Sequence, residues 1–513
     1  MGEYKPDKPT FSLDDIDSLG QLSLSRFVNE ELIKFSHADC ARSIPNGIDG
    51  LKVSQRKVLY AVKKRGLHYK GKSLKVAQLG GYTAEKTNYA HGEKNLYDTI
   101  IGMAHEYPGS NNIPLLYRDG QLGTRLEGGK DAADGRYVYT KMDALTELIF
   151  RAEDEPLLTQ VNDNGDLVEP EFYVPILPMA LINGCVTGIG TGWSCTIPCF
   201  NPKDMIKAIK TWIEYNGEVL IKDEDNPDVT ISMFDDIIPW YRGFKGDIER
   251  FNDTKFISYG IVEEGGRNTV KVKELPVGMW TSSFADFCTD LKADKKIRGF
   301  SNYSTPTHVN FTLQETSGFH CDLNTLKLHT YLHTSNMVTF DEEQVLRKYN
   351  TVDELLNNFC RVRYQYYILR KQHQIKMLEN ELRFLGNKER FVREVINNEL
   401  NIMNVEESDL TEELKKREYD EDPKKAEGEG GYDYLLRMPV RTLTANKVRQ
   451  LNDEINSLKT TLDNLRKLSE AEMWLRELEE FEQAYDKWLE TVEYEKPETS
   501  QKGTKKPSKK KTK

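Results

Sequence analysis

Two long segments near the C-terminus constrain the fold of this chain more than any other feature of its sequence. Residues 352–400 and 443–490 are highly charged, contain no proline and carry apolar residues at helical spacing, so each predicts an extended amphipathic helix. The intervening stretch EDPKKAEGEGGYDYLLRMP holds prolines and glycines that forbid one continuous helix. We therefore expect an antiparallel coiled-coil stalk with a small cap, a device that commonly holds a dimer contact at a distance.

In the rest of the chain, the pattern of apolar and turn-forming residues changes at several points. A length of 513 residues suffices for three or four domains. Short helical patterns and glycine-rich turns come first; strand-like runs such as KFISYGIV and NTVKVKELP then follow the helical segment PKDMIKAIKTWIEY. We expect, in chain order, a flexible segment 1–24, an α/β-type domain 25–198, an α+β domain 199–345, the stalk 346–490 with its cap at about 395–445, and a Lys-rich disordered tail 491–513.

The charge of the chain is distributed very unevenly. A net charge of −11 argues weakly against nucleic acid, but phosphates are neutralised by nearby cations, so local charge decides. Residues 51–75 hold nine Lys or Arg and no Asp or Glu, and the run KGTKKPSKKKTK closes the chain. Both runs suit a polyanionic partner.

The cysteines and the apolar runs bear on the compartment. The seven cysteines are odd in number and scattered, so they indicate neither a disulfide framework nor a zinc ribbon. No stretch approaches the roughly 18 consecutive apolar residues of a membrane span, and the first residues form no apolar signal core. We expect an intracellular protein with reduced thiols and no membrane contact.

Two segments place cations or a histidine where a phosphate contact is chemically reasonable. In PNGIDGLKVSQRKVLYAVKKR, turns lead into a helix whose cations include Lys52, Arg56 and Lys57, suited to DNA phosphates or to an ordinary basic surface. His91, in YAHGE beside a glycine turn, is suited to donate a hydrogen bond to a phosphate oxygen. A structural histidine is the alternative.

Two further segments are rich in glycine. GQLGTRLEGGKDAADGRYVYT puts Arg136 directly before Tyr137, so a cation stands beside a hydroxyl able to attack phosphorus, although any one of 25 tyrosines is a core or surface residue by default. In INGCVTGIGTGWS, the glycines at 188, 190 and 192 lack the Walker lysine and the order of a dinucleotide site. We interpret them as allowing a close backbone approach that presents Ile189 outward.

Taken in order, these motifs resemble the breakage–reunion core of the type IIA DNA topoisomerases, in eukaryotic and viral forms more than in bacterial gyrase. The resemblance covers roughly residues 25–490. It runs through FVNEELIKFSHADCARSIPNGIDGLK, QRKVL, KVAQLGG, HGE, GQLGTRLEGGKDAADGRYVYT, EPEFYVPILPMALINGCVTGIGTGWS, PWYRGFKGDI, ELPVGMW and YDYLLRMPVRTLT. Ala90 departs from the eukaryotic pattern, which usually has a second histidine before HGE.

The resemblance implies an α+β multidomain fold: a winged-helix DNA-cleavage domain over 25–198, an α/β tower domain over 199–345, and a long antiparallel coiled coil ending in a small helical dimerisation gate, the C-gate. It implies that Tyr137, not Tyr139, is the nucleophile, that Arg136 stabilises the scissile phosphate, and that His91 and Arg56 contact phosphates nearby. The implied wedge between base pairs is Ile189. Further DNA contacts are implied for Lys52, Lys57, Lys75, Gln78 and Asn183.

The family also needs Mg²⁺ held by a TOPRIM domain and ATP bound by an ATPase domain, and neither domain is apparent here. Asp223 and Asp225 form a D-x-D pair but lack the glycine that follows in TOPRIM, and we interpret them as a polar loop. We therefore expect a separately encoded subunit whose ATPase/TOPRIM partner holds both Mg²⁺ and ATP in a heterotetramer; a piece of a longer protein is the alternative. The chain itself is then expected to have no metal site.

The expected activity is relaxation or decatenation of double-stranded DNA by a homodimer joined at the C-gate. The compartment would be the host cytoplasm for a phage or bacterial protein, and the nucleus or viral factory for one from a eukaryotic virus. An inactive DNA-binding scaffold is one alternative, although the Arg-Tyr pair is intact. A purely structural coiled-coil protein is the other, and it explains only residues 350–490.

Overall fold

The computed structural model describes residues 23–492 except 224–225, 227–229, 267, 404 and 423–430. The predicted flexible segment 1–24 and the predicted tail 491–513 therefore lie outside the described residues, apart from their inner ends. The described residues form two compact units. The larger holds those of Met1–Ala152, Leu158–Val362 and Leu478–Lys513, and the smaller those of Glu153–Leu157 and Arg363–Glu477.

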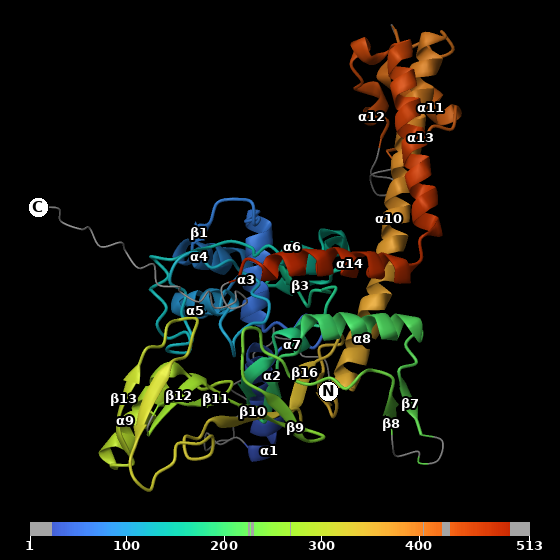
Figure 1. The fold of residues 1–513 in the computed structure, drawn as a ribbon. Helices are drawn as coiled ribbons and strands as arrows, with labels where there is room; N and C mark the ends of the chain where they lie inside the picture. The colour runs from blue at the N-terminus through green and yellow to red at the C-terminus, as the bar shows by residue number, and fades with distance from the viewer. Residues whose placement is uncertain are drawn as a thin grey trace, which may run out of the picture. The chain divides into compact units, whose positions relative to one another are not determined.

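The larger unit begins with a continuous helical run (Figure 1). It passes from α1 (Leu24–Arg26) through the π-helical η2 (Phe27–Leu32) to α2 (Ile33–Ser43), and it ends just before Pro45, as predicted. The π-helical turn was not expected. The other helices up to residue 182 are α3 (Val53–Arg65), α4 (Val76–Thr87), α5 (Glu93–Met103), α6 (Thr146–Ile149), the 3₁₀ turn η3 (Ala152–Leu157) and α7 (Met179–Ile182).

Short antiparallel strand pairs connect these helices. Strand β1 (Leu74–Lys75) pairs with β2 (Tyr139–Thr140), β3 (Gln160–Asp163) with β4 (Asp166–Pro170), and β5 (Cys185–Gly190) with β6 (Trp193–Ile197). Further pairs are β7 (Leu220–Lys222) with β8 (Thr230–Ser232) and β16 (Met337–Phe340) with β17 (Leu346–Tyr349). The β1–β2 pair joins the residues just before α4 to those just after Tyr137.

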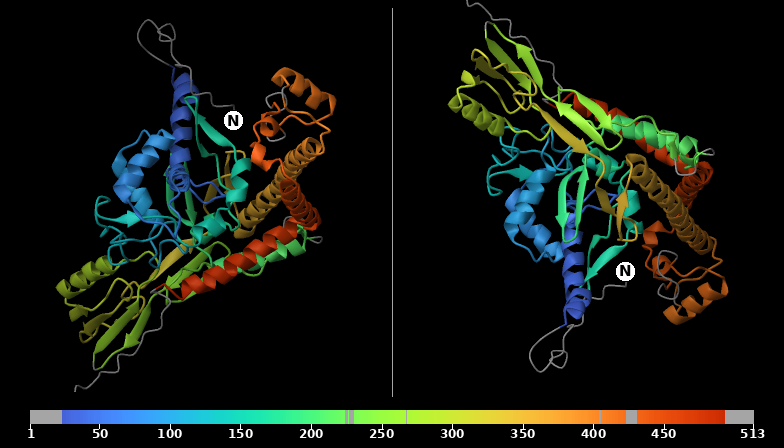
Figure 2. Two further views of the ribbon diagram at one scale, coloured as in Figure 1. Left: turned by 90° about the horizontal axis from the view of Figure 1, so that it is seen from above. Right: turned by 90° about the horizontal axis from the view of Figure 1, so that it is seen from below.

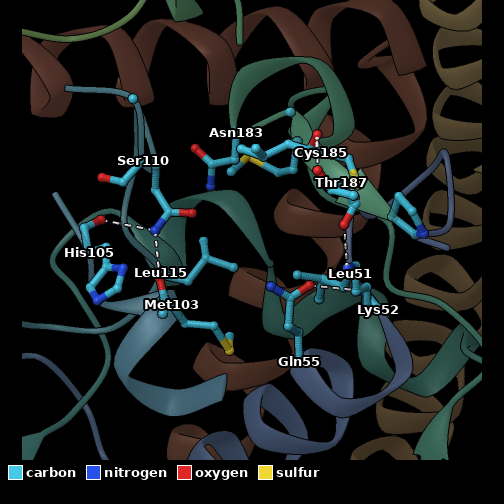
Figure 3. A pocket seen from close by; sticks show the side chains of 18 of the residues that line it. Leu51, Lys52, Gln55, Met103, His105, Ser110, Leu115, Asn183, Cys185 and Thr187 are labelled. Atoms are coloured by element: carbon cyan, nitrogen blue, oxygen red, sulfur yellow. Dashed lines mark hydrogen bonds between the residues drawn. The ribbon is translucent and has the colours of Figure 1, made fainter. Parts of the chain in front are cut away.

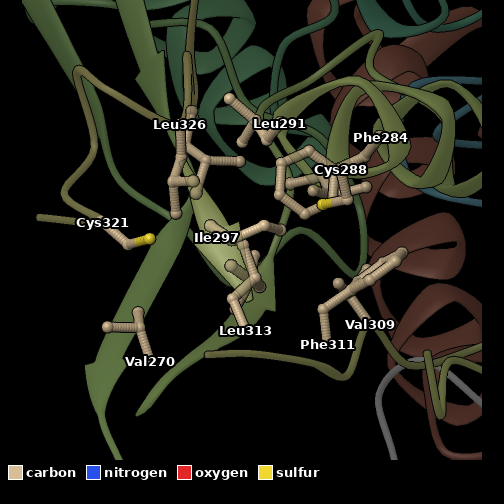
Figure 4. Packing of buried hydrophobic residues seen from close by; sticks show 13 residues of the cluster. Val270, Phe284, Cys288, Leu291, Ile297, Val309, Phe311, Leu313, Cys321 and Leu326 are labelled. Atoms are coloured by element: carbon tan, nitrogen blue, oxygen red, sulfur yellow. The ribbon is translucent and has the colours of Figure 1, made fainter. Parts of the chain in front are cut away.

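A four-stranded antiparallel sheet lies between residues 261 and 315, in the order β11 (Ile261–Glu264), β12 (Thr269–Glu274), β14 (Phe311–Glu315), β13 (Ile297–Asn302). Alternating burial along β12, where Val270 and Val272 point inward, matches the strand pattern predicted from NTVKVKELP. Helix α9 (Thr281–Ala293), which was not predicted, packs Phe284 and Leu291 onto this sheet (Figure 4). This region thus has its own apolar core.

A three-stranded sheet completes the strands of this region, with β10 (Lys255–Tyr259) between β9 (Ile248–Asn252) and β15 (His329–His333). The helix predicted from PKDMIKAIKTWIEY is α8 (Pro202–Glu214), and Asn201 caps it by accepting a hydrogen bond from the Lys203 amide. Its Lys210 pairs with Glu482, so α8 runs beside the C-terminal part of α14 (Glu470–Leu489) in both views of Figure 2.

The smaller unit is built on two antiparallel helices. The first is α10 (Val352–Ile396) from Arg363 onward. The second, α13 (Ala445–Lys467), runs beside it in the opposite direction (Figures 1 and 2), and the Arg466–Glu379 ion pair joins the two helices. Between them lie α11 (Glu407–Lys416), α12 (Asp433–Leu436) and the 3₁₀ turn η4 (Val440–Thr442). Buried residues from this stretch and the end of α10 form a separate apolar cluster, which accounts for the predicted cap.

The prediction of a second long helix is wrong in one respect, because the segment forms two helices, α13 and α14. The break falls at Leu468, whose backbone is extended, and at Ser469. The Ser469 hydroxyl accepts a hydrogen bond from the Glu472 amide, and the Glu472 carboxylate accepts one from the Ser469 amide. This reciprocal S-x-x-E capping box starts a new helix without proline or glycine, and it is a signal that the periodicity alone did not reveal.

A buried ionic cluster lies in the smaller unit. Arg363 pairs with Asp154 at 2.9 Å, Arg370 pairs with Asp154 and Glu477, and the Tyr367 hydroxyl donates to Glu477. Both arginines are almost completely buried, and so is Asp154. Because burial raises the pKa of the Asp154 carboxyl while the two guanidinium groups oppose that rise, the carboxylate and the cations depend on one another.

We expect Asp154→Asn to destabilise the smaller unit by about 3–5 kcal/mol, because it leaves two buried guanidinium groups with Glu477 as their one remaining anion in this cluster. Hydrogen exchange of the α10 amides at residues 363–396 in the full chain measures this. Asp463→Asn, at an exposed position on α13, is the matched control and should change little. Equal protection in both variants would contradict the dependence on Asp154.

Candidate functional site

The loop that carries Tyr137 is held in a fixed shape by its own residues. Gly123 and Gly129 approach so closely that a Cβ on Gly123 would lie 2.7 Å from the Gly129 Cα, and both have positive φ. Asp131 accepts hydrogen bonds from the Thr124 amide at 2.8 Å and the Thr124 hydroxyl at 2.6 Å. Only glycine permits this backbone approach, so the glycine-rich sequence encodes a rigid loop rather than a flexible one.

The same loop is anchored at two places outside itself. On one side, Arg125 forms a buried ion pair with Glu274 of β12, and Gly128 lies against the ring of Trp280. On the other side, the amide of Ala77 in α4 donates to the carbonyl of Gly135, and a Cβ on Gly135 would lie 3.2 Å from the Tyr97 ring. These anchors set the position of the two residues that follow.

Arg136 and Tyr137 stand on the exposed end of the loop. Tyr137 is 72% exposed, and the Arg136 guanidinium lies 5.9 Å from its ring centroid. Arg136 donates from Nε to Asp134 Oδ1 at 2.9 Å, and this hydrogen bond lowers the pKa of the Asp134 carboxyl. The site thus presents an exposed phenol beside a cation that is held in place by an acid.

His91 lies at a second place, just before α5. Arg42, from the end of α2, lies with its Nη1 3.4 Å from the His91 Nε2, and the ring of Tyr89 packs against His91 edge-on at 5.3 Å. These residues line a pocket of about 590 Å³ together with Lys57. An exposed arginine and histidine side by side suit an anion such as a phosphate.

Arg42 was missed by the sequence reasoning. It belongs to the ARSIP stretch that supports the resemblance, but nothing in its spacing links it to a histidine 49 positions later. A cation near the end of α2 before Pro45 was the signal available, and only the fold brings it to His91.

Three of the predicted DNA-contacting residues have their polar atoms occupied inside the protein. Arg56 is 4% exposed and pairs with Asp49 at 2.7 Å; burial opposes its charge, but the Asp49 carboxylate outweighs this and raises the pKa of Arg56. Lys57 pairs with Glu169, and the Asn183 amide exchanges two hydrogen bonds with the backbone of Ile113. Their contacts with DNA remain predictions, and in this structure all three stabilise the fold.

Three others face the surface or its margin. Gln78 is exposed on α4, and Lys75, half-buried before α4, lies over the Tyr139 ring at 5.9 Å. Lys52, at the start of α3, donates to the carbonyl of Thr187 in β5 at 3.2 Å (Figure 3). Lys52 therefore ties the basic helix to the hairpin that carries Ile189.

The β5–β6 hairpin presents Ile189 to solvent, 71% exposed, as expected from its glycines. A Cβ on Gly188 would lie 2.7 Å from the Ser43 carbonyl oxygen, and one on Gly190 would lie 2.9 Å from the Cys40 Cα. The glycines thus let the hairpin backbone lie directly on α2. An exposed isoleucine on a supported hairpin is suited to insert into an apolar partner surface, such as a base stack.

Neither a metal-ligand cluster nor a membrane span is found in the described part of the chain. Among those residues, no group of three or more His, Cys, Asp or Glu is placed to hold a metal ion. Of the D-x-D pair, Asp223 is described and Asp225 lies outside the described residues. No helix within the described ranges is long and apolar enough to cross a membrane.

Between Lys52, Asn183 and His105 lies a pocket of about 320 Å³ (Figure 3). Desolvation lowers the pKa of His105 to about 4, so its ring is neutral at pH 7. The ring also supports the tyrosine loop, since a Cβ on Gly129 would lie 2.5 Å from the His105 Cε1.

Lowering the pH from 7 to 5 should therefore destabilise the larger unit through His105. The unfolded chain takes up a proton near pH 6.5, whereas the folded chain resists it until about pH 4, so stability is lost as pH falls through this window. We expect the loss to be smaller by about 2 kcal/mol in His105→Gln, measured by urea unfolding at both pH values. His333→Gln, at an exposed position, is the control; equal losses in all three proteins would refute the assignment.

Known proteins are similar to this chain over almost its whole length. The family model for the A subunit of DNA gyrase/topoisomerase IV matches residues 42–479. The protein named DNA topoisomerase 2 of Invertebrate iridescent virus 6 is 41% identical over 490 residues, and that of Saccharomyces cerevisiae is 35% identical over 529 residues. These alignments cover 94% and 92% of this chain but only 41% and 35% of the two relatives.

A solved structure is similar as well. The DNA-binding, cleavage and re-ligation domain of Plasmodium falciparum topoisomerase II matches with a TM-score of 0.80 and 37% identity. The match covers 91% of this chain and 65% of that chain. This likeness confirms the predicted mixed helix-and-strand architecture with its long coiled-coil helix.

Proposed function

Because the chain belongs to the DNA gyrase/topoisomerase IV A-subunit family, we propose that it is the DNA-cleaving and religating subunit of a type IIA topoisomerase. The observation that carries the proposal is the rigid loop that presents an exposed Tyr137 beside Arg136. The exposed isoleucine of the β5–β6 hairpin and the Arg42–His91 pair add a wedge and an anion site. The family membership itself confirms the resemblance expected from the motifs.

In the proposed reaction, the Tyr137 oxygen attacks a backbone phosphorus in line with the leaving oxygen. The bond from phosphorus to the 3′ oxygen breaks, leaving a 5′-phosphotyrosyl ester and a free 3′-hydroxyl, and two subunits cut opposite strands. The ester conserves the bond energy, so the 3′-hydroxyl reverses the attack without ATP. A second duplex crosses the break before it is resealed.

The fixed charges of the chain would hold the phosphates during this exchange. Arg136 would release Asp134 and bind an oxygen of the scissile phosphate, and the Arg42–His91 pair would donate hydrogen bonds to a neighbouring phosphate. Lys52, Lys75 and Gln78 lie at the surface or its margin and would line the path of the duplex, while Ile189 would separate two base pairs and bend it. Arg56 acts as a positioning residue through Asp49.

Mg²⁺ and ATP belong to the family's reaction, and we place both on a partner subunit with TOPRIM and ATPase domains. The matched relatives are much longer than the part that this chain covers. The assembly would be a heterotetramer with two copies of this chain joined at the α11–α12 cap of the smaller unit. We place it inside the cell, where its DNA substrate lies.

The first test is cleavage of supercoiled plasmid by this chain with Mg²⁺, alone and with its candidate partner, followed by detergent and protease. Tyr137→Phe should bind DNA normally yet form no covalent adduct, because it removes only the phenol hydroxyl. Tyr139→Phe is the matched control and should still give linear DNA with protein on its 5′ ends.

Other outcomes would overturn parts of the proposal. Covalent adducts that persist in Tyr137→Phe would show that another residue is the nucleophile, and Tyr139 would be the next candidate. Cleavage by this chain without the partner would place the metal site in this chain. Tight DNA binding with no cleavage under either condition would favour the inactive scaffold.

The Arg136–Asp134 contact generates a second prediction. Asp134→Asn removes the anion that competes with phosphate for Arg136, so it should tighten binding of a short fluorescent duplex by up to about fivefold, the range of an exposed ion pair. Glu127→Gln removes the same charge from another position of the same loop and controls for net charge. If both variants gain equally, the contact has no specific role.

A further inference from the structure

Four of the seven cysteines pack against the β5–β6 hairpin. Cys185 and Cys195 lie within its strands, Cys40 of α2 donates to the Thr191 carbonyl at its turn, and Cys199 follows β6 and donates to the Asn183 carbonyl. All four are buried free thiols. The element that presents Ile189 is therefore the most thiol-rich part of the described chain.

Two of these thiols are neighbours on one face of the hairpin. Cys195 pairs across the strands with Gly188 and Cys185 with Ile197, and all four are buried, so both sulfurs point to the same side. A Cβ on Gly188 would lie 3.4 Å from the Cys195 Cβ and 3.5 Å from the Cys185 Sγ. The missing side chain of Gly188 thus leaves a space that the Cys185 and Cys195 side chains share.

The two thiols differ in access and in charge. Cys185 is 8% exposed and lines the 320 Å³ pocket beside Thr187 (Figure 3), whereas Cys195 is fully buried. The hydrogen bond from Cys195 and the nearby Lys52 ammonium lower the pKa of Cys185, against the effect of burial. The same hydrogen bond and burial raise the pKa of Cys195. Cys185 is thus the more accessible thiol of the pair and the one whose thiolate is favoured.

We propose that Cys185 and Cys195 are a peroxide-sensitive dithiol that closes to a reversible disulfide across the β5–β6 hairpin. The pocket admits a small oxidant to Cys185, Lys52 favours its thiolate, and Cys195 is already in contact with it. This site lies apart from Tyr137, and the chemistry is independent of DNA cleavage.

The chemistry balances with hydrogen peroxide as the two-electron oxidant. The Cys185 thiolate attacks one peroxide oxygen, the O–O bond breaks, and the departing hydroxide takes up a proton to become water, leaving a sulfenic acid on Cys185. The Cys195 sulfur then attacks the Cys185 sulfur. The S–O bond breaks, and the hydroxide leaves as water with the Cys195 proton. Two thiols are oxidised to one disulfide, and one peroxide is reduced to two waters.

The disulfide would change the hairpin at its irregular point. The strand register shifts between Cys185 and Gly188, so a covalent link between Cys185 and Cys195 fixes that bulge and restricts the end of β5 that carries Ile189. On the proposed function, which this consequence assumes, the oxidised protein would bend its duplex less. Reduction by a dithiol would restore bending.

The test is peptide mass spectrometry of the full chain after hydrogen peroxide and blocking of remaining thiols. We expect a Cys185–Cys195 linked peptide that disappears on reduction, and loss of free thiol at this pair at least about tenfold faster than elsewhere. Cys288 and Cys321 are the internal control, because both are buried in the α9 core yet lie on opposite sides of it (Figure 4). In Cys195→Ser, dimedone should trap a sulfenic acid on Cys185.

Other results overturn the proposal. Free thiols at both positions after the control pair has reacted, or a Cys185 sulfenic acid that never proceeds to a linked peptide, would exclude the disulfide. Neither readout requires DNA cleavage, so failure of the proposed function leaves this test intact. Bending is measured by energy transfer across a doubly labelled duplex; oxidation should reduce it in the native chain and not in Cys195→Ser, and an equal effect in both would exclude the link as its cause.

Discussion

The ion pair between Arg56 and Asp49 is the interaction on which the rest of the site depends. Asp49 accepts hydrogen bonds from Arg56 of α3, from the amide of Leu51 before that helix, and from the amide of Tyr173 more than a hundred residues later. One buried carboxylate thus holds three separate segments together. Without it, the start of α3, where Lys52 lies, and the segment that leads to the hairpin would lose a shared buried anchor, and the remaining guanidinium would be a buried, unpaired charge.

Much of the fold followed from patterns in the sequence. Apolar spacing predicted α8 and the long helix α10, and alternation predicted β12, because in each case one face packs on a core. The glycines around Ile189 correctly predicted a close backbone approach. Motif order predicted the family. These successes share a cause, since each depends on neighbours in the chain or on a pattern that burial imposes directly.

The features that escaped prediction depend on partners far away in the chain or on a local cap. A basic helix suggests an exposed cationic face, yet Arg56 turns inward because Asp49 is there to neutralise it. The Arg42–His91 contact joins two elements whose spacing carries no motif. The break before α14 coincides with the reciprocal capping box of Ser469 and Glu472, a local signal that helical periodicity does not reveal.

The two anchors of the tyrosine loop have a consequence for how such a protein can be dissected. A border at residue 198 separates two regions of the sequence, but the buried pair of Arg125 and Glu274 crosses it, and so does the contact between Gly128 and Trp280. A fragment that ends at this border would keep Tyr137 and lose half of the loop's support. A fragment that keeps both anchors of the tyrosine loop must therefore extend past the four-stranded sheet, because the loop is held by contacts between regions that are distant in the sequence.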